Sequence, residues 1–174
     1  IHYPIENVMD LEKNEIKVIS SDANSDWHLK NENKYCIIIL RHVLEHLLEP
    51  RNILSKIRKA LNHDGVLYIA VPNNLNPKQN LHTFWYRVVH TYYFNKFSLF
   101  NMLAIEKLKV IFLNEGDELG PHELIAVVKK SNSTILPQIS KDHFNIQKQA
   151  FSERLKIDNK IVNKLKRVVQ SWIK

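Results

Sequence analysis

Glycine and cysteine are scarce in this chain of 174 residues. It has three glycines, Gly65, Gly116 and Gly120, where an average usage of ~7% would give about twelve. None of them belongs to a G-x-G-x-x-G pattern, so the sequence holds no glycine-rich loop of the kind that grips a nucleotide. The lone Cys36 excludes an internal disulfide. Because it lies in an apolar run, we predict that it is a buried small hydrophobe.

Long apolar runs and evenly spread charge are also lacking. No run reaches the roughly 18–20 residues needed to cross a bilayer, and no signal-peptide pattern opens the chain, so we expect a cytoplasmic protein. Residues 1–140 hold 16 Lys/Arg and 15 Asp/Glu, whereas residues 141–174 hold 9 and 3. The net charge of +7 therefore belongs mainly to the tail, and the body gives no electrostatic reason to expect nucleic acid as a partner.

Apolar runs alternate with a helical pattern in the first half of the chain. Residues 35–40 read as a strand buried on both faces of a parallel sheet. Pro50 can open a helix, because its missing N–H costs nothing in the first turn. We expect this helix to end in the turn 62–65 and the next buried strand to span 66–71.

The second half predicts a helix followed by a hairpin. Ser98 is a plausible N-cap for a helix that runs to about Lys107. Residues 109–113 and 123–128 read as strands joined by a turn. With an earlier short strand at 16–19, this order predicts an α/β fold with a mainly parallel sheet and one antiparallel strand at its end.

Three segments match, in order, the second half of a class I S-adenosylmethionine-dependent methyltransferase. They are a strand with an acidic loop (16–23), the strand-helix-strand unit (35–73) and the aromatic stretch LHTFWYRVVHTYYFNKFSLFNML (81–103). The resemblance covers about residues 3–130. It implies a Rossmann-like methyltransferase sheet that is incomplete, because the first βαβ unit is missing, and that ends in an antiparallel hairpin.

The resemblance implies S-adenosylmethionine as cofactor and methyl transfer to a small-molecule or glycan-precursor acceptor. Without the missing amino-terminal part, the chain is expected to be either a fragment of a longer enzyme or a domain completed in another way. The alternative is a non-catalytic methyltransferase-like module kept for assembly.

The resemblance also places residues beside the cofactor. The carboxylate of Asp22 would accept a hydrogen bond from the adenine amine, which is a donor. Asp22 in a plain Asx turn is the alternative. The predicted cofactor-side residues are Asp22, Ala23, Leu40, Arg41 and His42.

His42, Glu45 and His46 satisfy H-x-x-E-H, a motif of metal-dependent peptidases. On one helix the two histidines would share a face and bind an ion, with Glu45 as base and Glu118 or Glu123 as a third ligand. Pro50 closes the segment early, however, so a polar cluster that orders a turn is the favoured interpretation, and no metal is expected.

The aromatic stretch resembles the substrate side of the family. The predicted substrate-side residues are Trp85, Arg87, Tyr92 and Tyr93. His90 could act as general base on an acceptor hydroxyl, because imidazole titrates near neutral pH. The alternatives are a structural histidine and aromatic side chains that pack the core or a lid.

The sequence divides into a methyltransferase-like domain (1–130), a linker (131–141) and a basic amphipathic helical segment (142–174). Apolar residues recur at helical spacing along the last segment, with lysines between them. We expect this helix to dock on the body or on a second copy in a homo-oligomer. Contact with a membrane surface is the alternative.

Overall fold

The protein is represented by a computed structural model that describes residues 22–77, 80–81, 85–86, 88–116, 122–138 and 141–172. The predicted strand at 16–19, the substrate-side Arg87 and the suggested ligand Glu118 lie outside the described residues.

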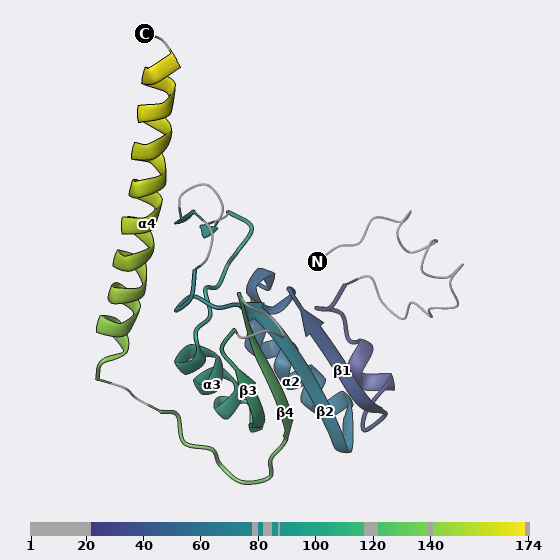
Figure 1. The fold of residues 1–174 in the computed structure, drawn as a ribbon. Helices are drawn as coiled ribbons and strands as arrows, with labels where there is room; N and C mark the ends of the chain where they lie inside the picture. The colour runs from purple at the N-terminus through teal and green to yellow at the C-terminus, as the bar shows by residue number, and fades with distance from the viewer. Residues whose placement is uncertain are drawn as a thin grey trace.

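The described strands form one four-stranded sheet in the order β1-β2-β4-β3 (Figure 1). Strand β1 (Tyr35–Arg41) runs parallel to β2 (Leu61–Pro72). Strand β4 (Glu123–Lys130) is antiparallel both to β2 and to β3 (Leu108–Asn114). The predicted α/β class with a parallel pair and a terminal antiparallel hairpin is confirmed. The antiparallel strand β4 lies inside the sheet, between β2 and β3, rather than at its edge.

One face of the sheet carries the core. Leu67, Ile69 and Val71 of β2 alternate onto this face and pack with apolar residues of the two helices α2 (Pro50–Ala60) and α3 (Lys96–Ile105). Strand β1 contributes Ile38 and Leu40, which are level with Leu67 and Ile69 in the parallel register. Strands β1 and β2 and helices α2 and α3 thus bury their apolar side chains in a single layer between helices and sheet.

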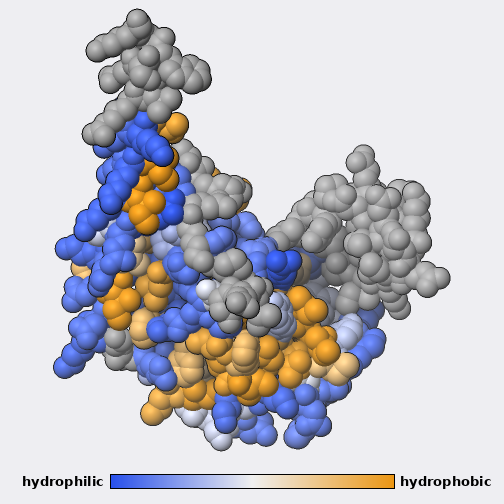
Figure 2. All heavy atoms as spheres, in the orientation of Figure 1, coloured by the Kyte–Doolittle hydropathy of each residue, from blue (hydrophilic) through white to orange (hydrophobic). Residues whose placement is uncertain are grey.

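The other face of β1 is uncovered among the described residues. Ile37 and Ile39 are 58% and 63% exposed, and Figure 2 shows an apolar patch over the sheet in this view. The prediction that residues 35–40 are buried on both faces is therefore wrong for β1. Cys36 is likewise exposed rather than buried, although it alternates with Ile38 and Leu40, and it lies at the irregularity in the β1–β2 register between Tyr35 and Ile37.

Helix α2 begins at Pro50 as predicted, but no separate turn follows it. Strand β2 starts directly at Leu61, and residues 62–65 belong to it. Gly65 lies where β1 and β2 come together after an irregularity in their register. A Cβ atom at this position would be 2.7 Å from the carbonyl oxygen of Tyr35, so the close approach of the two strands requires glycine.

Helix α3 is capped by Asn95 and not by the predicted Ser98. The Asn95 Oδ1 accepts hydrogen bonds from the N–H groups of Phe97 and Ser98 at 3.0 Å each. Ser98 is the third helical residue, and its Oγ accepts from the Asn95 N–H at 3.0 Å. This reciprocal capping box satisfies N–H groups that a helix start otherwise leaves unpaired.

The predicted carboxyl-terminal helix is present as α4 (His143–Trp172). Figure 1 shows that its first half lies beside the body and that its second half extends beyond it. The division into a domain, a linker and this helix remains a prediction. Within the described part of the chain, no helix combines the length and the apolar character that crossing a membrane requires.

Candidate functional site

Charged side chains meet where β1 ends and β4 begins. Glu123 is the first residue of β4, and β4 pairs with the end of β2. Its Oε1 accepts hydrogen bonds from Arg41 Nη2 at 3.0 Å and from His42 Nε2 at 2.7 Å. Two predicted cofactor-side residues are thus held by a carboxylate at the carboxyl end of a parallel strand. In open α/β sheets this is the edge where ligands bind.

The contacts of Glu123 also set its charge state. Partial burial acts to raise the pKa of Glu123, but the hydrogen bonds and positive charges of His42 and Arg41 outweigh it and hold the pKa below its ordinary value of 4.5. Hydrogen bonds to a carboxylate favour the ionised form. Glu123 is therefore an anion that fixes both neighbouring side chains.

His42 has an unusual backbone conformation. Its φ is 51°, in the left-handed region, which a residue with a Cβ adopts at a cost of roughly 1–2 kcal/mol. The N–H of His42 still donates to the carbonyl oxygen of Ala70 on β2 at 2.9 Å. This turn takes the chain from β1 into the short helix η2 (Leu44–His46).

Glu45 is buried in this turn. Its side chain is 1% exposed, and neither carboxylate oxygen has a hydrogen-bond partner among the described residues. Oε1 lies 3.4 Å from His42 Nδ1 and 3.7 Å from His46 Nε2. A buried, ionised carboxylate is costly unless it is paired. The histidines on either side are the nearest groups that can carry a compensating charge.

His46 joins this turn to the aromatic stretch. Its Nδ1–H donates to the carbonyl oxygen of Val89 at 2.8 Å, and its Nε2 faces the Glu45 carboxylate at 3.7 Å. The rings of His46 and His90 are in edge contact, with centroids 4.9 Å apart. A carboxylate oxygen of Glu45 and one ring nitrogen each of His46 and His90 all lie within 4.8 Å of one another.

The H-x-x-E-H segment does not form one helix. His42 ends the strand region, η2 is three residues long, and α2 starts only at Pro50. His42 directs Nε2 to Glu123 rather than to a point shared with His46. The peptidase arrangement, which needs both histidines on one helical face, is therefore absent from this segment, whose residues are all described.

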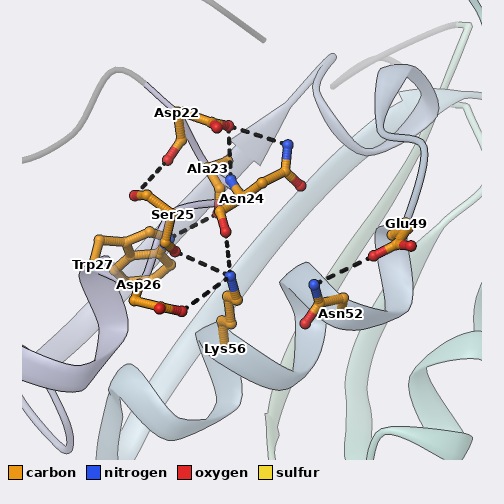
Figure 3. A network of polar contacts seen from close by, with 9 residues as sticks. All are labelled: Asp22, Ala23, Asn24, Ser25, Asp26, Trp27, Glu49, Asn52 and Lys56. Carbon is orange, nitrogen blue, oxygen red and sulfur yellow. Dashed lines mark hydrogen bonds and ion pairs between the residues drawn. The ribbon is translucent and has the colours of Figure 1, made fainter.

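The loop that contains Asp22 is anchored on α2 (Figure 3). Asp22 Oδ1 accepts from the backbone N–H of Asn24 at 2.8 Å and from its side chain at 3.1 Å. This is the Asx turn named as the alternative for Asp22. The buried Lys56 of α2 donates to the carbonyl oxygens of Asn24 and Ser25.

Ala23 takes part in the same arrangement. Its carbonyl oxygen accepts from Trp27 Nε1 at 3.0 Å, at the start of the short helix η1 (Trp27–Lys30). The Asp22 carboxylate remains exposed beside this anchored loop. The contacts thus fix the Asp22 loop on α2, whereas residues 40–42 are fixed on β2 and β4. That the Asp22 loop and residues 40–42 contact a cofactor stays a prediction.

The predicted substrate-side residues differ in burial. Trp85 is 6% exposed, and its Nε1–H donates to Asn74 Oδ1 at 3.0 Å, so it packs the core. The Tyr92 hydroxyl donates to the carbonyl oxygen of Leu48 at 3.3 Å. The Tyr93 ring lies between those of His90 and Tyr86, with centroid distances of 5.8 and 5.0 Å.

Tyr86 was not predicted as a site residue, although it lies in this row of rings. Burial, and to a smaller degree the neighbouring Tyr93, raises the pKa of its phenol above 10.0. Phe151 of α4 contacts its ring at a centroid distance of 5.7 Å. The row Tyr86, Tyr93, His90 and His46 therefore connects α4 to the turn after β1.

A cavity of about 360 Å³ lies between the loop after β2 and α4. Its lining residues come from the loop after β2 and from α4: Leu75, Asn76, Pro77, Ile146, Gln149, Ala150, Glu153, Arg154 and Ile157. None of the predicted cofactor-side or substrate-side residues is among them. The cavity is a feature of the contact between α4 and the body.

The strand order, with a parallel pair and an antiparallel hairpin covered by helices, defines a Rossmann-like α/β protein. The methyltransferase domain family model matches residues 5–111. The chain therefore belongs to the methyltransferase domain family, and the resemblance seen in the sequence is confirmed. No curated protein matches the chain.

Solved structures share the fold at low sequence identity. A SAM dependent methyltransferase from Archaeoglobus fulgidus has a TM-score of 0.55 at 18% identity, with 72% of each chain covered. The PH0226 protein from Pyrococcus horikoshii OT3 has a TM-score of 0.52 at 14% identity, with 73% of this chain and 66% of that chain covered.

A third similar structure is the 1,6-didemethyltoxoflavin-N1-methyltransferase of Burkholderia thailandensis, with bound 1,6-didemethyltoxoflavin and S-adenosylhomocysteine. Its TM-score is 0.53 at 15% identity, and the match covers 75% of this chain but 58% of that one. The present chain thus spans less than two thirds of that relative.

Proposed function

We propose that this chain supplies the carboxyl-terminal part of a site for S-adenosylmethionine-dependent methyl transfer. The observation that carries the proposal is the sheet order β1-β2-β4-β3, with the Leu40–His42 turn at the carboxyl end of β1. Membership of the methyltransferase domain family supports the reaction class. The names of two similar structures support S-adenosylmethionine as cofactor.

The described residues fit one side of such a cofactor. Asp22 offers an exposed carboxylate, an acceptor suited to the adenine amine. Main-chain groups of residues 40–42 lie at the carboxyl end of β1. The side chains of Arg41 and His42 are hydrogen-bonded to Glu123. When bound, the cofactor supplies an electrophilic methyl group on a sulfonium. The glycine-rich turn that the family places upstream is not in this sequence.

The acceptor would lie beside the row of rings that includes His90 and Tyr93. Transfer is a single displacement, so holding the acceptor in line with the methyl group supplies much of the rate. His90 would take the proton of an acceptor hydroxyl, and Tyr93 packs against its ring at a centroid distance of 5.8 Å. We propose a small molecule or a glycan precursor as the acceptor.

Calorimetry with S-adenosylhomocysteine tests the proposal. We expect weak binding to the chain, lost in Asp22→Ala and retained in Asp64→Ala. The Asp64 carboxylate is also exposed, but it lies near the start of β2, at the opposite end of the sheet from the Leu40–His42 turn. If the coding DNA continues upstream with a glycine-rich segment, the longer protein should bind more tightly. Absence of heat from both proteins would refute the enzyme proposal and leave the non-catalytic module.

A second candidate function is binding of a divalent cation by Glu45, His46 and His90. The buried carboxylate without a hydrogen-bond partner favours it, as does the cluster of ligand atoms within 4.8 Å. The Val89 carbonyl orients His46 in the way that second-shell groups orient metal-binding histidines. This set replaces the proposed hydrolase set of His42, Glu45 and His46.

Metal analysis tests this candidate. After incubation with Zn²⁺ and exhaustive dialysis, the chain should retain one ion, because two imidazoles and a carboxylate suit Zn²⁺, and His90→Asn should lose it. His63→Asn is the matched control, because His63 is exposed and its ring contacts the adjacent Asp64, away from Glu45, His46 and His90. Retention below one ion for each ten chains, or equal retention by both variants, would eliminate the cation site.

A further inference from the structure

The second half of α4 carries a row of exposed apolar side chains. Figure 1 shows this part of the helix extending beyond the body. Ile157, Ile161, Val162 and Leu165 are between 41% and 59% exposed. Ile157, Ile161 and Leu165 follow one another at four-residue spacing, so they lie along one side of the helix. We call these four residues the α4 apolar row.

This row continues the side by which the first half of α4 is attached to the body. His143 and Gln147 accept hydrogen bonds from Asn95 Nδ2 at 2.7 and 3.0 Å. Asp158 Oδ2 accepts from the Leu81 N–H at 3.0 Å. Residues 143, 147, 151, 154, 158, 161 and 165 follow one another at three- or four-residue spacing, which places the anchoring contacts and the row on the same side.

Basic side chains occupy the neighbouring side of the helix. Lys156, Lys160 and Lys164 are exposed and are again four residues apart. Residues 159–174 contain five Lys/Arg and no Asp/Glu. Pairing of two copies through this segment would bring like charges together without an acidic partner, which disfavours self-association. Nucleic acid would meet the lysines but would leave the apolar row uncovered.

We propose that the second half of α4 lies on an anionic membrane surface. The α4 apolar row would enter the boundary between headgroups and acyl chains, while the lysines beside it contact lipid phosphates. An apolar side next to a lysine-rich side is the pattern of interfacial helices. Clusters of lysine on such helices favour anionic lipids. No described helix has the length and apolar character to span the bilayer instead.

Bilayer contact would have a consequence for the acceptor side of the protein. The anchored half of α4 contacts the aromatic stretch through Tyr86 and Phe151, whose rings are 5.7 Å apart. Gln147 Nε2 also donates to the Asn74 carbonyl oxygen at 2.8 Å. A membrane under α4 would therefore hold this stretch close to the lipid surface. A lipid-linked acceptor suits that position, an extension that rests on the proposed methyl transfer.

Co-sedimentation of the full chain with vesicles tests the membrane proposal independently of methyl transfer. Vesicles of phosphatidylcholine with about one third phosphatidylserine should bind the chain, and phosphatidylcholine alone should bind it far less. Lys160→Gln with Lys164→Gln should weaken partitioning about 25-fold, at about fivefold for each lysine. Ile161→Ser and Leu165→Ser should each weaken it about tenfold.

The double variant Lys30→Gln with Lys59→Gln is the matched control. It removes the same charge from exposed positions of the body and should bind as the original chain does. Circular dichroism confirms that each variant keeps its helix. No binding to the anionic vesicles would overturn the proposal, as would equal loss in the control. A soluble dimer that Leu165→Ser dissociates, with vesicle binding unchanged, would assign the α4 apolar row to a second copy.

Discussion

Asn95 should be one of the most sensitive polar positions in the chain. It is 4% exposed and serves two helices at once. Its Oδ1 caps α3 through the N–H groups of Phe97 and Ser98, and its Nδ2 donates to His143 and Gln147 of α4. Replacement by alanine removes the cap and both anchoring bonds without changing the apolar core.

The expected cost follows from these contacts. Loss of an N-cap side chain costs typically ~1 kcal/mol. Each buried hydrogen bond to α4 contributes about 1 kcal/mol net. The sum, about 3 kcal/mol for Asn95→Ala, is a large part of the ~5–15 kcal/mol that holds an average domain folded. Asn95→Asp keeps the acceptor for Phe97 and Ser98 but cannot donate to α4, so it should cost about 2 kcal/mol.

Urea unfolding followed by circular dichroism measures both free energies. Hydrogen exchange then separates the two roles of Asn95. The Phe97 and Ser98 amides should lose protection in Asn95→Ala and keep it in Asn95→Asp, whereas the first turns of α4 should lose protection in both. A cost below about 0.5 kcal/mol for Asn95→Ala, with unchanged exchange, would refute the capping and anchoring assignment.

Three further changes probe the sheet and its edge. Gly65→Ala should destabilise the fold by about 1–3 kcal/mol in the same unfolding assay, because the new Cβ would meet the Tyr35 carbonyl oxygen at 2.7 Å; an unchanged midpoint would contradict this. The pKa of Glu123 is lowered in the folded chain, so its contribution to stability is present above pH 4.5 and lost as the pH falls through the lowered value. Glu123→Gln should therefore unfold less steeply with acid than the original chain, and identical acid profiles would show that the carboxylate adds nothing. His42→Gly should be more stable than His42→Ala by about 1 kcal/mol, because φ is 51° at this position; equal stabilities would indicate that the turn relaxes.

Patterns local in sequence predicted most of the described fold. Pro50 marks the start of α2, and the apolar spacing of residues 53–61 marks its buried side. The run 66–71 forms the second half of β2, a strand with neighbours on both sides, so its continuous apolar character matches its burial. The equally apolar run 35–40 led to a wrong prediction of burial on both faces, because burial also depends on whether a second layer covers each face of the sheet.

The errors at Cys36 and Ser98 have the same physical origin. Cys36 lies at the irregularity in the pairing of β1 with β2, which residues 35–41 do not themselves encode. Ser98 has the right chemistry for a cap, but Asn95 occupies the earlier position. Asn95 also hydrogen-bonds to His143 of α4, which lies 48 residues further along the chain. Local propensity cannot choose between two good capping residues when a distant partner contributes to the choice.

The candidate site shows a similar limit. The sequence named Arg41 and His42 because they follow a strand, and both indeed lie at its carboxyl end. It could not assign Glu123 as the group that holds them, because the antiparallel register of β4 on β2 brings Glu123 there from 81 residues beyond His42. Nor could the sequence assign Lys56 as the residue that anchors the Asp22 loop, because its partners Asn24 and Ser25 lie 32 and 31 residues earlier in the chain.

Glu45 connects the two predicted sides of the site. Its backbone carbonyl oxygen accepts from the N–H groups of Thr91 and Tyr92 at 2.8 and 3.1 Å, while its carboxylate lies between His42 and His46. A shift of the turn after β1 must therefore move Thr91 and Tyr92 with it. Glu45→Gln, which keeps the backbone bonds, should retain the fold but change the environment of both histidines. Histidine NMR titration would register that change, and unaltered His42 and His46 signals would show that the carboxylate does not couple them.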